Sequence, residues 1–147
     1  MKEVSLNAYV PSQSAAQVYA AISDFSAYPR LCESVRHIDI ESVDENVVLS
    51  NWEVNFHSGI LKWQERDVFD PANLHIHFRQ TAGDIEHFSG YWQVSEAPEG
   101  ASIAFHSCFD LGLPMLADML DPVAREAIRD NISAIINGLF PNSHIKD

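Results

Sequence analysis

Residues 121–141 read DPVAREAIRDNISAIINGLFP, and this stretch decides the fold. Asp121 followed by Pro122 is typical of a helix start, because proline sacrifices no backbone hydrogen bond in the first helical turn. Pro141 ends the pattern. Between them one wide apolar stripe recurs at helical spacing: Val123, Ala127, Ile128, Ile132, Ile135, Ile136 and Leu139. The stretch therefore predicts a long C-terminal helix that lies in an apolar trough.

Upstream of this helix, apolar and polar residues alternate as they do in half-buried β-strands. The predicted strands are Glu3–Val10, Arg36–Ser42, Glu45–Asn55, Gly59–Phe69, Leu74–Ala82, Glu86–Ser95 and Ser102–Leu111. Short turn segments separate the last six, which favours antiparallel neighbours in a meander.

Two short helices are expected between the first strand and the meander. Ser14 and Gln17 have the spacing of a capping box, and a second short helix is expected around Pro29. The resulting order predicts an α+β fold in which a curved seven-stranded antiparallel sheet wraps around the C-terminal helix and encloses an apolar cavity. We expect residues 1–147 to form a single domain, with residues 142–147 frayed.

The charge balance narrows the classes of partner. The chain has 21 Asp and Glu against 9 Lys and Arg, so it repels phosphate backbones and anionic lipids, and we expect no nucleic-acid partner. No apolar run is long enough to span a membrane, so no integral membrane contact is expected. The two cysteines, Cys32 and Cys108, fit a reducing compartment, and the sequence predicts a cytoplasmic protein.

Large aromatic residues share the strand faces that would look toward the final helix. The main ones are Trp52, Phe88, Trp92 and Phe105, and small residues such as Gly90 and Ser107 lie between them. This spacing suits a lined cavity as well as a filled core. From the pattern alone, a filled core is the more common outcome.

The Gly59–Phe69 strand leaves its orientation open. One face carries Lys62, Gln64 and Arg66, and the other carries Leu61 and Trp63. Either face can point inward, and a bulge would place both Trp63 and Arg66 inside. Arg66 facing solvent is the simpler reading of the periodicity.

Four histidines, His75, His77, His87 and His106, raise the question of a metal site. A solvated outer face is the better expectation, because no carboxylate or cysteine joins them at ligand spacing, and a zinc site built from same-face histidines on adjacent strands stays open. No phosphate loop or dinucleotide fingerprint is present, and no cofactor is expected.

Three segments carry a family resemblance: SDFSAYPRL at 23–31, WQERDVFDP at 63–71 and FSGYW at 88–92. Together they resemble the polyketide cyclase/dehydrase branch of the START and birch-pollen-allergen superfamily. The resemblance implies a helix-grip fold with a deep hydrophobic cavity. It also departs from the pattern of the family, because Cys32 and Val35 stand where pocket aromatics are expected.

The function implied by the resemblance is that of an aromatase/cyclase, which performs regiospecific aldol cyclisation and dehydration of a poly-β-ketone carried on an acyl carrier protein. The implied catalytic residues are Arg66, which would donate a hydrogen bond to the developing enolate or alkoxide, and Tyr28. The expected substrate-binding residues are Trp52, Trp63, Phe88, Trp92, Phe105, Cys32, Val35, Met119 and Ile132.

Two other functions stay open at this point. One is a noncatalytic carrier of a quinone, isoprenoid or lipid, which needs only an apolar cavity. The other is an interaction domain with a filled interior, and a homodimer is compatible with any of the three.

Overall fold

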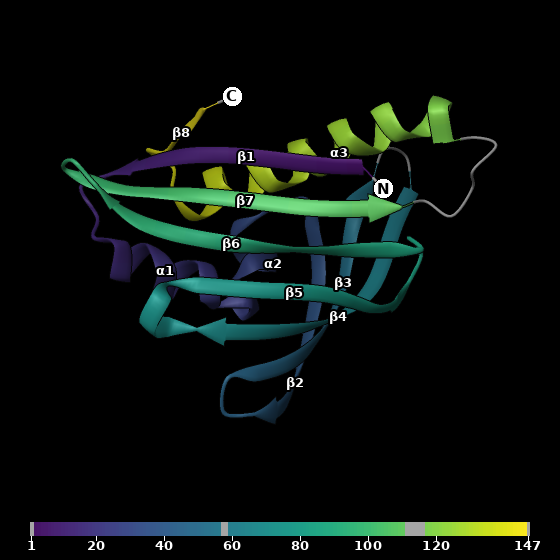
Figure 1. Ribbon diagram of the computed structural model, residues 1–147, viewed down its shortest axis with the longest axis horizontal. Helices are drawn as coiled ribbons and strands as arrows, with labels where there is room; N and C mark the ends of the chain where they lie inside the picture. The colour runs from purple at the N-terminus through teal and green to yellow at the C-terminus, as the bar shows by residue number, and fades with distance from the viewer. Residues whose placement is uncertain (1, 57–58, 111–116, 147) are drawn as a thin grey trace.

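The computed structural model describes residues 2–56, 59–110 and 117–146, with side chains except at 56 and 117–121. Within these ranges one antiparallel sheet has the strand order β2-β3-β4-β5-β6-β7-β1-β8 (Figure 1). The strands are β1 (Lys2–Pro11), β2 (Val35–Asp44), β3 (Val47–Phe56), β4 (Gly59–Asp70), β5 (His75–Gly83), β6 (His87–Ala97), β7 (Gly100–Asp110) and β8 (His144–Lys146).

The helices are α1 (Ala15–Ser23), α2 (Tyr28–Leu31) and α3 (Ala117–Leu139), with 3₁₀ turns at Phe25–Ala27 and Pro71–Asn73. The predicted capping box starts α1: the Gln17 N–H donates to Ser14 Oγ, and the Ser14 N–H donates to Gln17 Oε1. Within the described residues, no helix is long and apolar enough to cross a membrane.

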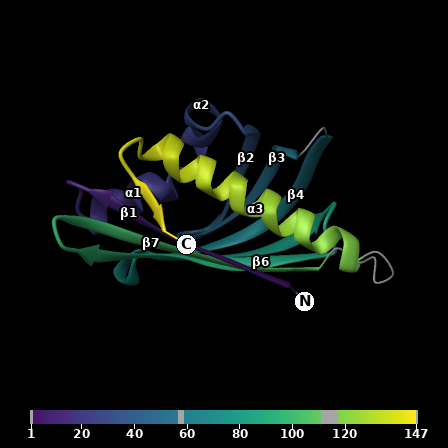
Figure 2. The same cartoon turned by 90° about the horizontal axis from the view of Figure 1, so that it is seen from above.

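The sheet is curved, and α3 crosses its inner face (Figure 2). The C-terminal end of α3 lies against α2, where Gly138 permits a close approach. A Cβ added at Gly138 would lie 3.1 Å from Cys32 Sγ and would collide with the Leu31 carbonyl oxygen. Contact between α3 and the backbone of α2 therefore holds this end of the long helix in place.

The predicted helix-grip architecture is confirmed, and two of its details are wrong. The long helix begins at Ala117 and passes through Pro122, with the loss of a backbone hydrogen bond, instead of starting at Asp121. The C-terminal tail does not fray, because β8 pairs with β1, matching Ala8 with Ile145. This pairing supplies an eighth strand and covers an edge of β1 that would otherwise be exposed.

Gly90 on β6 provides a test of how closely β6 and β7 approach. A Cβ at this position would lie 2.8 Å from Ser107 Cα and would also meet the His106 carbonyl, neither of which is a flexible group. We expect Gly90→Ala to lower the free energy of unfolding by about 1–3 kcal/mol, measured by urea denaturation. Ser95→Ala, at an exposed position on the same strand, should change it by no more than about 0.5 kcal/mol. Equal stability of the two variants would contradict the close approach.

Candidate functional site

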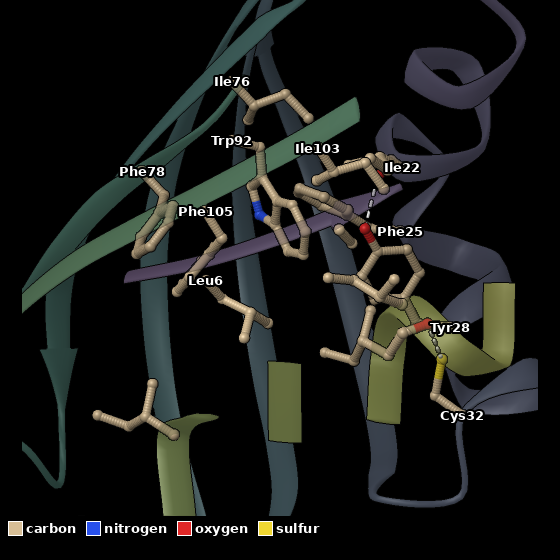
Figure 3. Packing of buried hydrophobic residues seen from close by; sticks show 14 of the residues in the cluster. Leu6, Ile22, Phe25, Tyr28, Cys32, Ile76, Phe78, Trp92, Ile103 and Phe105 are labelled. Atoms are coloured by element: carbon tan, nitrogen blue, oxygen red, sulfur yellow. Dashed lines mark hydrogen bonds between the residues drawn. The ribbon is translucent and has the colours of Figure 1, made fainter. Parts of the chain in front are cut away.

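A cavity of about 70 Å³ lies between the inner face of the sheet and α3. Aromatic and aliphatic side chains supply nearly all of its wall. Figure 3 shows Phe78, Trp92 and Phe105 side by side on the inner face of the sheet. The full set of described lining residues is Phe25, Trp52, Val54, Leu61, Trp63, Glu65, Phe78, Ile85, Phe88, Trp92, Phe105, Ile128, Asn131, Ile132 and Ile135.

Ring packing explains why the cavity is small. Trp52 on β3 and Trp63 on β4 are directly cross-strand and stack, with centroids 5.6 Å apart and planes 4° from parallel. Phe88 meets Trp63 edge-on at 5.8 Å, and Trp92 meets Phe105 at 4.8 Å. The remaining space is about half of the ~150 Å³ of an engineered apolar cavity that accepts benzene. A larger ligand therefore has to displace side chains or α3.

The Glu65 carboxyl on β4 is the ionisable group that faces this cavity among the described lining residues. Its side chain is 4% exposed, and Oε1 accepts a hydrogen bond from Trp63 Nε1 at 2.7 Å. Regular alternation along β4 turns Leu61, Trp63 and Glu65 to the same side of the sheet. The Trp63 indole thus holds the Glu65 carboxyl in otherwise apolar surroundings.

Asp67, two residues further along β4, is fully buried behind Glu65. Trp52 Nε1 donates to Ser50 Oγ at 2.8 Å, and the Ser50 hydroxyl donates to Asp67 Oδ2 at 2.5 Å. Asp67 Oδ1 has no other donor among the described residues. A hydrogen bond between the Asp67 and Glu65 side chains, which requires a proton on one of the two carboxyls, links Asp67 to the cavity wall.

Burial is the main cause of the pKa shifts of these two carboxyls. Burial raises the pKa of Glu65 well above its ordinary value, and hydrogen bonding with and repulsion from Asp67 raise it further. The Trp63 hydrogen bond acts in the opposite direction. Burial also raises the pKa of Asp67, while its bonds with Glu65 and Ser50 oppose that shift. Both carboxyls therefore favour the protonated form more than free carboxyls do, and the shift is larger for Glu65.

Six of the predicted substrate-binding residues line the cavity: Trp52, Trp63, Phe88, Trp92, Phe105 and Ile132. Cys32 and Val35 are buried but do not line it. The Cys32 thiol contacts the Ile135 carbonyl at 3.6 Å, and burial raises the pKa of this thiol to about 11. The Met119 side chain lies outside the described residues.

Arg66 does not point into the cavity, so its predicted contact with an enolate is wrong for this structure. The side chain is exposed on the outer face of β4, where its cross-strand neighbours are Leu49 and Arg79. A bulge does lie nearby, but it falls in β5: Gln64 pairs with Ala82 and Glu65 pairs with Gln80. The alternation of β4 is therefore uninterrupted and keeps Arg66 in solvent.

The predicted catalytic role of Tyr28 does not fit the structure either, because its hydroxyl forms a hydrogen bond within the core. The Tyr28 hydroxyl donates to the Ile22 carbonyl at 2.5 Å, and the Tyr28 ring meets Phe25 edge-on at 5.4 Å (Figure 3). Burial raises the pKa of Tyr28 well above 10.0. The residue joins α2 to α1 and does not line the cavity.

Sequence reasoning missed Glu65 and Asp67, although a signal was present. On the Gly59–Phe69 strand these two carboxyls share a face with Leu61 and Trp63. If the large apolar residues are assigned inward, both acids follow them.

The sequence of the chain matches a known protein family. The family model described as "Polyketide cyclase / dehydrase and lipid transport" matches residues 12–136. A search of curated proteins finds no match.

Solved structures resemble the chain over nearly its full length. TTHA0849 from Thermus thermophilus is 20% identical with a TM-score of 0.88, and the match covers 95% of both chains. The Zhui aromatase/cyclase from Streptomyces sp. R1128 is 16% identical with a TM-score of 0.84, covering 95% of this chain and 92% of that one. A START superfamily protein from Mycobacterium smegmatis is 17% identical with a TM-score of 0.78, covering 95% and 97%.

The raised pKa of Glu65 predicts how stability depends on pH. The folded protein holds the Glu65 proton more tightly than the unfolded chain, so the Glu65 contribution is fully present below the ordinary pKa of 4.5 and is lost as pH rises through the raised folded-state pKa. We expect Glu65→Gln, which mimics the protonated acid, to lose that part of the pH dependence, which amounts to at most about 1.4 kcal/mol per pH unit.

Urea unfolding between about pH 4 and about pH 8 measures this difference. Glu86→Gln, which removes an exposed carboxyl, should retain the pH profile of the wild-type protein. Parallel profiles for the wild-type protein and Glu65→Gln would show that Glu65 is not protonated in the folded state.

Proposed function

The chain belongs to the polyketide cyclase/dehydrase and lipid transport family, and on this premise we propose that it is an aromatase/cyclase. Its reaction would be the regiospecific aldol cyclisation and dehydration of a poly-β-ketone. The observation that supports this proposal is the buried Glu65 carboxyl, with its raised pKa, in the wall of an otherwise apolar cavity. A buried acid with a raised pKa is suited to general acid–base catalysis near neutral pH.

Both chemical steps need one proton delivered and one removed. In the aldol step the enol carbon attacks a carbonyl carbon, Glu65 protonates the carbonyl oxygen, and the resulting Glu65 carboxylate takes the enol proton. In the dehydration Glu65 protonates the leaving hydroxyl, which departs as water. The carboxylate then accepts the adjacent C–H proton as its electron pair forms the C=C bond. Glu65 ends each step protonated, and no other reagent is consumed.

Asp67 is placed to assist as a positioning residue. It receives the Ser50 hydroxyl bond, and the Trp52 indole supports that serine. When Glu65 has given up its proton, this chain of donors stabilises negative charge on the acid pair. The chain also limits the rotation of the carboxyls in the cavity wall.

The stacked aromatic residues would contribute through shape. Folding a flexible ketide so that one methylene meets one carbonyl can lower the barrier by up to about 7–11 kcal/mol in well-oriented cases. The flat faces of Trp52 and Trp63 suit a flat, conjugated product. Because the cavity is about 70 Å³, substrate binding has to widen it, and closure afterwards would exclude water.

A carrier function is the second candidate, and the apolar wall favours it. With Glu65 protonated, the described lining residues carry no charge, so the cavity also suits a neutral quinone, isoprenoid or lipid. Native mass spectrometry of protein purified from its own host distinguishes the two. A stoichiometric lipid, together with no conversion of ketides, would support the carrier.

We expect Glu65→Gln to reduce cyclised product by about 10²–10⁴-fold while ligand binding is retained. The substitution keeps the size of the side chain and an oxygen that can accept from Trp63, so it removes mainly the proton. The measurement is product analysis by liquid chromatography and mass spectrometry, with poly-β-ketone supplied on an acyl carrier protein by a ketosynthase. Quenching of tryptophan fluorescence reports binding.

Two control variants make this test specific. Glu86→Gln removes an exposed carboxyl outside the cavity and should leave product formation unchanged. Arg66→Ala should do the same, because Arg66 lies on the outer face. Full activity of Glu65→Gln, or loss of activity in Arg66→Ala with the fold intact, would overturn the assignment of the proton donor to Glu65.

A further inference from the structure

Three potential metal ligands converge on the outer face of the sheet, away from the cavity. Glu3 on β1 is directly cross-strand from Cys108 on β7, and His106 lies two residues before Cys108 on the same face. His106 Nε2 is 3.3 Å from Glu3 Oε1 and 3.7 Å from Cys108 Sγ. Cys108 Sγ is 3.9 Å from Glu3 Oε1. The three donor atoms therefore form a compact triangle.

The triangle has nearly the size of one face of a tetrahedral zinc site. Zinc bonds are about 2.0–2.2 Å to nitrogen and oxygen and about 2.3 Å to sulfur, which separates donor atoms by about 3.3–3.6 Å at the tetrahedral angle. The distances of 3.3, 3.7 and 3.9 Å are close to this range. Small rotations of the exposed Glu3 side chain would close the remaining difference.

His106 is already oriented as a metal ligand. Its Nδ1 lies 2.8 Å from Ser5 Oγ, and the Tyr91 ring lies 5.6 Å away, centroid to centroid. A neutral histidine that donates Nδ1–H to Ser5 presents the lone pair of Nε2 to Glu3 and Cys108. Metal-binding histidines usually have such a partner on the second ring nitrogen.

We infer that Glu3, His106 and Cys108 form a binding site for one zinc-class divalent cation, with water in the fourth position. Thiolate and imidazole ligands favour zinc and cobalt over magnesium and calcium. The net charge of −12 attracts cations to the surface. On binding, the Cys108 S–H proton passes to solvent as the sulfur–metal bond forms.

From the sequence alone a metal site is not the expected outcome, because no carboxylate or cysteine joins the histidines at ligand spacing along the chain. The cross-strand register overturns that reasoning: Glu3 and Ser5 on β1 pair with Cys108 and His106 on β7. The cation site lies on the face opposite the cavity, so it does not depend on the proposed cyclase activity.

Titration of the untagged chain with Co²⁺ tests the site through its absorption spectrum. We expect one equivalent to produce visible bands of tetrahedral cobalt and a sulfur-to-cobalt charge-transfer band, both removed by Zn²⁺. Cys108→Ser should abolish the charge-transfer band. Ser5→Ala, which removes the supporting hydroxyl, should lower the metal affinity about 10–100-fold. His106→Gln, which removes a ligand, should lower it at least as much.

His77→Gln is the matched control, because His77 is exposed on the outer face of β5 and belongs to no part of the triangle. Its titration should match that of the wild-type protein. Circular dichroism checks that each variant is folded. No saturable binding, a spectrum without the charge-transfer band, or native affinity in Cys108→Ser would each overturn the proposal.

Discussion

Strand alternation along β4 is the constraint on which the candidate site depends. A β-strand sends every second side chain to the same face, so Trp63 cannot enter the core unless Glu65 and Asp67 enter with it. Donors from Trp63 and Ser50 reduce the energetic cost of burying two carboxyls, and the raised pKa values of the pair favour keeping a proton on it. A core that would otherwise be only apolar thereby gains a proton donor.

Much of the fold could be predicted from local patterns, because alternation and helical periodicity are local properties. The core was predicted correctly from the aromatic faces of the strands and from the helical stripe that includes Ile128 and Ile132. The start of α3 and the pairing of β8 could not be predicted in the same way. The helix extends one turn before Pro122, against the preference of proline, and β8 depends on pairing with the distant strand β1.

The site was harder to predict than the fold. Trp52, Phe88, Trp92 and Phe105 followed from strand faces. Ile132 followed from the helical stripe, and the strand pattern left the orientation of Trp63 open. The resemblance misassigned the polar groups. The orientation of Arg66 depends on where a bulge falls, and that bulge lies in β5. The role of Tyr28 depends on the Ile22 carbonyl, an acceptor that no side-chain pattern reveals. The outer triangle joins Glu3 to Cys108 through sheet register, which only the assembled structure displays.

The close contact at Gly138 holds the C-terminal end of α3 against α2, and nine residues earlier Arg129 Nη1 donates to the Ser5 carbonyl of β1 at 3.2 Å. Ile128 lies ten residues from Gly138, or about 15 Å along the helix axis at 1.5 Å per residue. A tilt of about 10° about Gly138 would move Ile128 by about 2.6 Å and would leave the contact with Leu31 nearly in place. Widening the cavity by such a tilt would break the hydrogen bond from Arg129 to β1 but no hydrogen bond between strands of the sheet.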